Sequence, residues 1–218
     1  MDELLTEKDL LFACCFAPSI VFWVWSGGLH LCGANRHYTG KVTLSEMVWS
    51  QLIVDALQTI GALLRLFVLE DTDTSWRWYK VGLGLLGVDL VEYWLHRVEH
   101  NWQWINAIHK RHHRLVPVHT MGTFYNDPRQ IFFDAVFLAM LILLFQLTII
   151  EVAIVSSISV FFTVHDHWPS APNEPLTRHE RHHHTGPSAD FSQPFTGIWD
   201  FVFGTRVKDV YLRKQAVN

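Results

Sequence analysis

Histidine is distributed unevenly along this chain of 218 residues. Twelve of the fourteen histidines lie between His96 and His184. Neutral imidazole nitrogen is a common ligand for transition metals. Side chains three and four positions apart share one face of a helix, so HxxxH and HxxHH spacings predict imidazoles that point together. The histidines fall into four groups: His96 and His100; His109, His112 and His113; His165 and His167; and His179, His182 and His183.

The number of imidazoles indicates two metal ions rather than one. Eight histidines of the first, second and fourth groups, with at least one of the third, give about nine ligands, more than one ion holds. An all-nitrogen ligand set fits iron or zinc. The spacing leaves both His165 and His167 as candidates in the third group. We expect the remaining histidines to be interfacial, surface or outer residues: His30, His37, His119 and His184.

Two carboxylates precede the first histidine pair along one helical stripe. Asp89, Glu92, His96 and His100 are spaced by 3, 4 and 4 residues. Carboxylates behind metal-bound imidazoles orient the rings and raise their basicity. Asp89 and Glu92 are therefore candidates to support the ligands. The alternative is that both are polar residues that pack helices together.

The composition is that of an integral membrane protein with a sizeable polar part. Half of the residues are hydrophobic and the mean hydropathy is +0.14. A formal net charge of −4 provides no basic field for nucleic acid. The acidic start lacks the basic region of a cleaved signal peptide, so we expect the first apolar segment to be retained. Five segments are candidate spans: 10–32, 47–69, 79–95, 131–147 and 152–164.

The last two apolar segments predict a helical hairpin over 131–164. Such a hairpin enters the membrane and returns, so residues 96–113 and 165–184 emerge on the same face. Histidine groups far apart in sequence can then meet. A shallow position of the second segment or of the hairpin would change the span count without separating these groups.

Lysine and arginine predict the orientation in the membrane. With five spans, one face holds one basic residue in 1–9 and two in 70–80. The other face holds two in 33–46, five in 96–130 and six in 165–218. Basic loops stay in the cytosol, so we expect the histidine side to be cytosolic.

Two further patterns exclude other cofactors. Cys14, Cys15 and Cys32 have no CxxC spacing, so a thiolate metal site is not expected. The GLGLLG run at 82–87 is a glycine-spaced helix face within an apolar segment and not a dinucleotide loop. Because no flavin or nicotinamide motif is present, electrons for any redox chemistry must come from outside the chain.

The histidine groups and their flanks resemble the fatty acid hydroxylase superfamily of membrane enzymes, and within it most of all the sphingoid-base 4-hydroxylases. The resemblance runs from about Asp89 to Thr205. It rests on six segments: DLVEYWLHRVEH, AIHKRHHRLVPV, GTFYNDP, VHDHW, RHERHHH and DFSQPFTGIWDFVFGT. It maps eight ligands onto the first, second and fourth groups. In the third, the 4-hydroxylase pattern favours His167 and the sterol desaturase pattern His165. Asn126 and Asp166 lie where supporting residues are expected.

The resemblance implies a non-haem diiron centre, with O2 as cosubstrate, that hydroxylates an unactivated C–H bond of a lipid-like substrate. Zinc is a second metal that such ligands accept in purified protein. Electrons would come from cytochrome b5 and its NAD(P)H reductase, with the enzyme in the endoplasmic reticulum and its catalytic face in the cytosol. A basic docking surface and simple positive-inside bias explain these residues equally well: Lys110, Arg111, Arg114 and Arg129.

We therefore expect an all-α integral membrane protein with four to five transmembrane helices and a cytosolic helical cap that holds a histidine-rich dimetal site. Residues 1–218 form one domain, with N-terminal spans in 10–95, catalytic parts in 96–130 and 165–218, and the hairpin in 131–164. Two alternatives on the same scaffold are a desaturase and a sterol or secondary-metabolite oxidase. A membrane metal transporter or sensor is the alternative of another class.

Overall fold

The computed structural model describes residues 7–68, 73–171, 175–185, 190–192 and 195–207. Some residues considered above lie outside them: Gln193 and Pro194 of the last similar segment, and the basic Lys208, Arg213 and Lys214. All secondary structure in the described part of the chain is helical. The elements are α1 (Glu7–Cys14), α2 (Ala17–Leu31), α3 (Leu44–Phe67), α4 (Trp78–Asn101), α5 (Gln103–His109), η1 (His112–Arg114), η2 (Thr120–Gly122), α6 (Pro128–Phe145), α7 (Ile149–Asp166), α8 (Arg178–Thr185) and α9 (Ile198–Val202).

The first apolar segment forms two helices where one was expected. α1 ends at Cys14 and α2 begins at Ala17, with Pro18 in its first turn. Proline has no amide hydrogen to donate and fits best in a first turn, so it begins a helix rather than continuing one. The 15 residues of α2 rise about 22 Å at 1.5 Å per residue, which is short of a membrane core.

Among the described residues, three helices are long and apolar enough to cross a membrane: α3, α6 and α7. Large hydrophobic side chains remain exposed on them, as expected for surfaces that face lipid. The chain is thus an integral membrane protein. The expected four to five spans would need α2, α4 or both as well. α2 is short, and α4 carries three carboxylates between its middle and its end: Asp89, Glu92 and Glu99.

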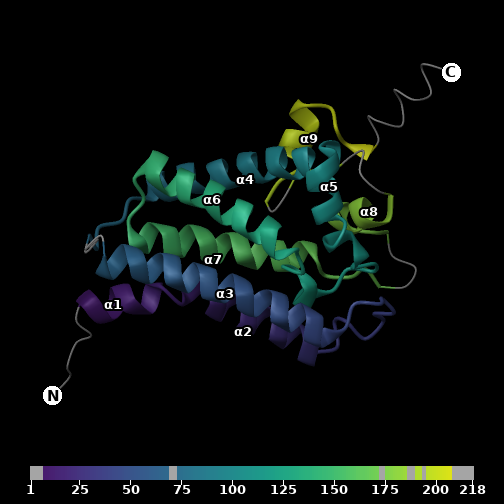
Figure 1. The fold of residues 1–218 in the computed structure, drawn as a ribbon, viewed down its shortest axis with the longest axis horizontal. Coiled ribbons are helices and arrows are strands. Elements are labelled where there is room, and N and C mark those ends of the chain that lie inside the picture. Colours follow the sequence, from purple (N-terminus) through teal and green to yellow (C-terminus); the bar gives the residue numbers. More distant parts are fainter. Residues whose placement is uncertain (1–6, 69–72, 172–174, 186–189, 193–194, 208–218) are drawn as a thin grey trace.

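The long helices run along the long axis of the molecule, while α5, α8 and α9 gather at one end (Figure 1). α7 packs against α2 and α4, and α6 packs against α3 and α4. Two glycines bring α4 close to its neighbours. A Cβ at Gly84 would lie 2.9 Å from Val155 Cγ2, and one at Gly87 would lie 2.7 Å from a ring carbon of Phe145.

Three residues join α6 to α7. Asp127 caps α6 and accepts a hydrogen bond from the Arg129 amide, and Gln146 ends the helix in the left-handed conformation. Thr148 begins α7 through a reciprocal capping box with Glu151. α7 therefore returns to the end of the bundle at which α6 begins.

Candidate metal centre

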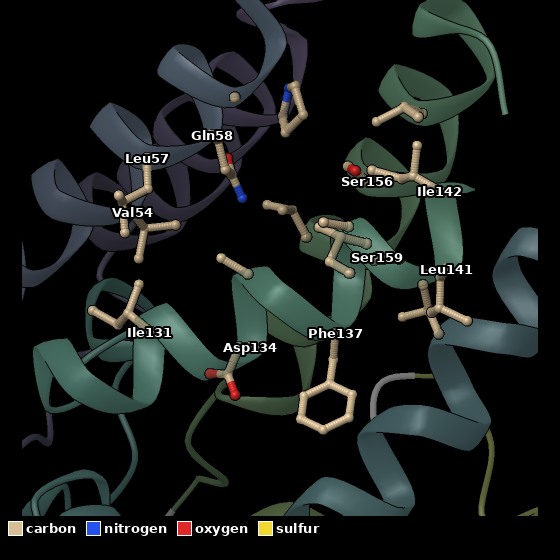
Figure 2. Close-up of a pocket in the computed structure, with 18 of the residues that line it drawn as sticks. Val54, Leu57, Gln58, Ile131, Asp134, Phe137, Leu141, Ile142, Ser156 and Ser159 are labelled. Carbon is tan, nitrogen blue, oxygen red and sulfur yellow. The ribbon is translucent and has the colours of Figure 1, made fainter. Parts of the chain in front are cut away.

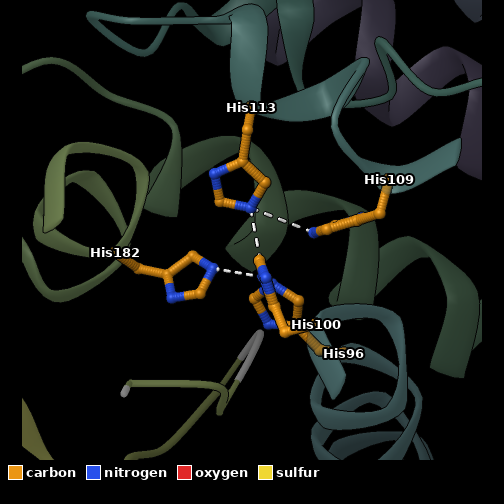
Figure 3. A group of neighbouring side chains, drawn as sticks. All are labelled: His96, His100, His109, His113 and His182. Atoms are coloured by element: carbon orange, nitrogen blue, oxygen red, sulfur yellow. Dashed lines mark hydrogen bonds between the residues drawn. The ribbon is translucent and has the colours of Figure 1, made fainter. Parts of the chain in front are cut away.

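Five imidazoles from three helices and one 3-10 helix converge at the end of the bundle that holds α5 and α8 (Figure 3). We call them the five-histidine group: His96, His100, His109, His113 and His182. One nitrogen from each lies within 4.8 Å of all the others. His113 Nε2 is 3.1 Å from both His100 Nε2 and His109 Nε2. His100 Nε2 is 2.8 Å from His182 Nε2.

Four more imidazoles converge beside the first five. This four-histidine group comprises His112, His167, His179 and His183, and all four residues are buried. Their Nε2 atoms form a closed ring of contacts. His179 Nε2 is 3.0 Å from both His167 Nε2 and His183 Nε2. His112 Nε2 is 3.1 Å from His183 Nε2 and 3.4 Å from His167 Nε2.

These distances fit metal coordination better than hydrogen bonding. A neutral imidazole has one N–H, so converging Nε2 atoms cannot all pair with one another. Nitrogens bound about 2.1 Å from one ion lie roughly 3.0 to 3.4 Å apart in octahedral or tetrahedral geometry. The Nε2 contacts in both groups span 2.8 to 3.4 Å. Nine imidazoles in two sets are therefore suited to hold two metal ions, as the sequence predicted.

Each HxxHH triplet is divided between the two groups, although the spacing predicted that its members would point together. α5 ends at His109, and His112 begins the 3-10 helix η1. His109 and His113 join the five-histidine group, and His112 joins the other. On α8 the division is reversed, because His182 alone joins the five-histidine group. The adjacent histidines in each HH pair thus belong to different histidine groups.

Two backbone carbonyls orient rings from behind. His96 Nδ1 lies 2.9 Å from the Phe191 carbonyl, and His167 Nδ1 lies 2.8 Å from the Thr163 carbonyl. A carbonyl only accepts, so each ring must donate its proton through Nδ1. Nε2 then presents its lone pair to the interior of the group, as metal ligation requires.

His109 is supported by two side chains that the sequence reasoning missed. Its Nδ1 lies 3.2 Å from Glu99 Oε2 and 3.3 Å from Gln130 Oε1. Glu99 was detectable, because it lies three residues after His96 and seven after Glu92 on the same stripe. Gln130 belongs to α6, and no local pattern connects it with His109.

The four residues expected to support the ligands have other surroundings. Asp89 accepts hydrogen bonds from the Thr196 hydroxyl at 2.9 Å and from the Phe195 amide at 3.3 Å. It therefore anchors the segment after α8, not an imidazole. The other three make no hydrogen bond to a histidine among the described residues: Glu92, Asn126 and Asp166.

The remaining histidines lie outside both groups. His165 is exposed and its ring meets Trp168 edge-on, whereas His167 lies inside the four-histidine group. His119 is buried against His30 and Tyr38, away from the centre.

Residues 190–192 are held next to His96 by a hydrogen-bond network around Asp200. Asp200 accepts hydrogen bonds from the Phe191 amide at 2.9 Å, the Ser192 amide at 2.8 Å and the Thr205 hydroxyl at 2.6 Å. This network fixes the Phe191 carbonyl that orients His96. Residues 190–192 and 198–205 thus support the five-histidine group from behind His96.

Burial keeps the imidazoles neutral. It lowers the pKa of His109 to about 3, with the charge of His182 acting in the same direction and the hydrogen bond to Gln130 opposing it. It lowers the pKa of His167 to about 4, against the opposing hydrogen bond to the Thr163 carbonyl. Metal ligation requires deprotonated nitrogen, and these rings provide it at neutral pH without a further cost.

A cavity of about 980 Å³ opens from both groups into the bundle. Two residues of each group line it: His96 and His109, and His112 and His167. Figure 2 shows part of its wall, built from α3, α6 and α7. Most of the lining is apolar, which suits the chain of a lipid. Its apolar wall residues include Val54, Leu57, Leu141, Ile142 and Val152.

Comparisons with known proteins agree with this site. Among the similar proteins is a very-long-chain aldehyde decarbonylase of Oryza sativa subsp. indica, which is 25% identical over 92% of this chain and 90% of its own length. A sphinganine C4-monooxygenase of Arabidopsis thaliana is 27% identical over 87% of this chain and 85% of its own. A sphingolipid C4-hydroxylase of Schizosaccharomyces pombe is 34% identical over 54% of this chain and 44% of its own. No solved structure matches significantly.

The profile of one protein family covers both histidine groups. It matches residues 81–205, more than half of the chain, and this region holds all nine converging imidazoles. The apolar helices, the paired histidine groups and this match lead to one assignment. The chain belongs to the fatty acid hydroxylase family and is a membrane oxidoreductase.

Proposed function

We propose that this protein hydroxylates an unactivated C–H bond of a long-chain lipid with O2, at a diiron centre held by the two histidine groups. The reaction is similar to that of the sphingoid-base C4-hydroxylases. One observation carries the proposal: both groups border the same end of an apolar cavity. Two iron ions bound there would supply the O2 chemistry, and the chain would supply nine imidazole ligands.

The surrounding residues bind and orient the substrate. The apolar walls of α3, α6 and α7 hold the lipid chain, and the cavity mouth sets which carbon lies beside the centre. Burial of the four-histidine group excludes water from the reacting end. The position of the substrate carbon decides between hydroxylation and desaturation, so a desaturase and a sterol or secondary-metabolite oxidase are variants of the same proposal.

We extend the proposal to topology and partners. One or both of α2 and α4 join α3, α6 and α7 as membrane-inserted helices, which gives four to five spans with the histidine end facing the cytosol in the endoplasmic reticulum. Cytochrome b5 and its NAD(P)H reductase deliver the electrons. The basic side chains near the centre would receive the donor, although Arg129 already pairs with Asp127, at 2.9 Å.

A second candidate is decarbonylation of a long-chain aldehyde. The observation in its favour is the rice relative, which aligns with nearly the whole of both chains. The same cavity would hold such a substrate. A metal transporter is less consistent with the structure, because the histidines gather at one end of the bundle and not along a path through it.

Lipid mass spectrometry of a host with and without the gene tests these candidates. A product 16 mass units heavier than its precursor supports hydroxylation, and one 2 units lighter supports desaturation. Conversion of an aldehyde to an alkane with one carbon fewer supports decarbonylation. The metal content of iron-replete protein, prepared without O2, is measured in parallel. If that protein holds about two metal ions per chain but no lipid changes in the host, the enzymatic proposal is wrong and the dimetal proposal stands.

A further inference from the structure

Two carboxylates lie in the cavity close to the metal end. Asp134 is on α6, one helical turn beyond Gln130, which contacts His109. Glu92 is on α4, two turns before Glu99, which contacts the same ring. At 1.5 Å per residue, Asp134 lies about 6 Å from Gln130 along α6, and Glu92 lies about 10 Å from Glu99 along α4. Both line the cavity.

Neither carboxylate has a partner among the residues that the structure describes. No hydrogen bond or ion pair from the described chain reaches Glu92 or Asp134. The charges that face Asp134 are those of Glu99 and Glu92, so its nearest charged neighbours repel it. Figure 2 shows its carboxylate between two apolar neighbours on the same helix, Ile131 and Phe137.

A third polar group borders the same space. Asn126 lines the cavity and is 9% exposed, and its Oδ1 is buried without a hydrogen-bond partner among the described residues. A buried acceptor without a partner costs free energy unless a ligand supplies a donor. Carboxylates in an apolar cavity cost more still. Three acceptors thus lack donors at the end of the cavity where the reaction would occur.

The residues that line the metal end of the cavity include no lysine or arginine. Arg65 is the one lysine or arginine among the lining residues, and it donates to the Leu147 carbonyl at the opposite end. The charge pattern therefore fits a ligand with a cationic, donor-rich headgroup at the metal end and an apolar chain along α3, α6 and α7.

We propose that Glu92 and Asp134 form a subsite that binds the ammonium group of a long-chain amino alcohol and thereby select the substrate. Asn126 accepts a hydrogen bond from a hydroxyl or from the ammonium of the same headgroup. This proposal rests on the proposed function, because it assumes that a lipid enters this cavity for oxidation. The subsite disfavours neutral aldehydes, which supply no donor to three acceptors.

Binding to the iron-loaded protein in nanodiscs tests the subsite directly. The probes are a radiolabelled long-chain 2-amino-1,3-diol, its N-acetyl derivative and a fatty aldehyde of equal chain length. We expect the amine to bind at least about tenfold more tightly than either neutral probe. Equal affinity for the amine and its N-acetyl derivative, or a preference for the aldehyde, would overturn the proposal.

Variants test whether Glu92 and Asp134 cause the preference for the amine over the neutral probes. Glu92→Gln and Asp134→Asn should each reduce it to less than about threefold while leaving the affinity for the neutral probes unchanged. Asp134→Glu keeps the charge and should keep the preference. Asp127→Asn is the matched control, because it removes one charge from the same helix and still caps it. An undiminished preference in both neutral variants would assign the ammonium to another site, and the wild-type probe series remains decisive if a variant fails to fold.

The two proposals fail separately. Selective binding of the amine without any oxidised lipid in the host would leave the subsite standing and refute the hydroxylase. Oxidation of a neutral lipid by wild-type protein that does not prefer the amine would support the hydroxylase and refute the subsite.

Discussion

The two histidine groups differ in how they are held. In the five-histidine group, His100 and His113 are half-buried, and the ring of His109 is supported by Glu99 and Gln130. In the four-histidine group all residues are buried, and the ring with a partner behind it is His167. Three Nδ1 atoms of that group have no partner in the described chain: those of His112, His179 and His183.

This difference predicts that the two groups tolerate the loss of one imidazole to different degrees. A group of five can lose one imidazole and still offer four, the usual number for a closed site. A group of four that loses one is left with an open position. The five-histidine group is also reached more easily by solvent, so its stability depends on supporting hydrogen bonds. The four-histidine group depends on packing.

The largest expected effect comes from neighbouring histidines of α8. His183→Ala leaves three ligands in the four-histidine group, so we expect about one metal per chain and a loss of conversion on the order of 100-fold or more. His182→Ala leaves four ligands in the other group, so about two metals should remain. Conversion should still fall comparably, because one of the ligands that position that ion is lost. Metal analysis and lipid product assays measure both.

His184→Ala is the matched control for this pair. His184 is the next residue of α8, is exposed and belongs to neither group. It should keep its metals and its activity. If His182→Ala and His183→Ala lost the same number of metal ions, the proposed difference in tolerance would be wrong.

The next effect concerns the third histidine pair. His167→Ala should remove about one metal per chain, because His167 completes the four-histidine ring. His165→Ala should change little, since its ring faces Trp168 at the surface. Metal content and lipid conversion, measured for both variants, show which of the two histidines is a ligand. Loss of metal in His165→Ala with retention in His167→Ala would reverse the assignment.

A smaller effect is expected behind the five-histidine group. Glu99→Gln replaces the acceptor of His109 with an amide, and loss of such a support costs about 10- to 100-fold in metal affinity. Competition with a chelator measures that affinity. Asp89→Asn is the comparison, because Asp89 contacts Thr196 and no imidazole. Equal losses in both variants would mean that Glu99 acts only through general stability.

The features of the metal centre that the sequence predicted are those set by spacing within one helix. Spacings of three and four residues identified eight imidazoles and their convergence, because these spacings act within one element. The division of the triplets was not predictable in this way. It depends on α5 ending at His109 and on where the Nε2 atoms of the fold meet. Asp89 likewise has the spacing of a supporting carboxylate, yet its partner lies 107 residues away in the chain.

The fold shows the same limit. The hairpin was predictable because only a few residues separate two apolar segments, and Thr148 and Glu151 among them supply a capping box. The break in the first segment had a visible signal as well, since Pro18 lies inside it. The cavity had no such signal in the sequence, because it arises from how α3, α4, α6 and α7 pack.

The smallest expected effect is a pH dependence of the metal-free protein. His167 has an ordinary pKa of 6.5 when unfolded and about 4 when folded, because burial disfavours its charged form. Below about pH 6.5 the unfolded chain therefore binds a proton that the folded chain does not, and the free energy of unfolding falls as the pH falls toward 4. One such buried imidazole costs about 1.4 kcal/mol at one pH unit below 6.5.

Tm measured in detergent after metal removal, between about pH 7.5 and 5.5, follows this loss. His167→Gln removes the titrating ring from the four-histidine group and should make the decline in Tm shallower. His165→Gln should leave the decline as it is, because that ring is exposed and lies outside the four-histidine group. A Tm that rises on acidification, or the same slope in wild type and His167→Gln, would show that burial of the four-histidine group is not what opposes protonation.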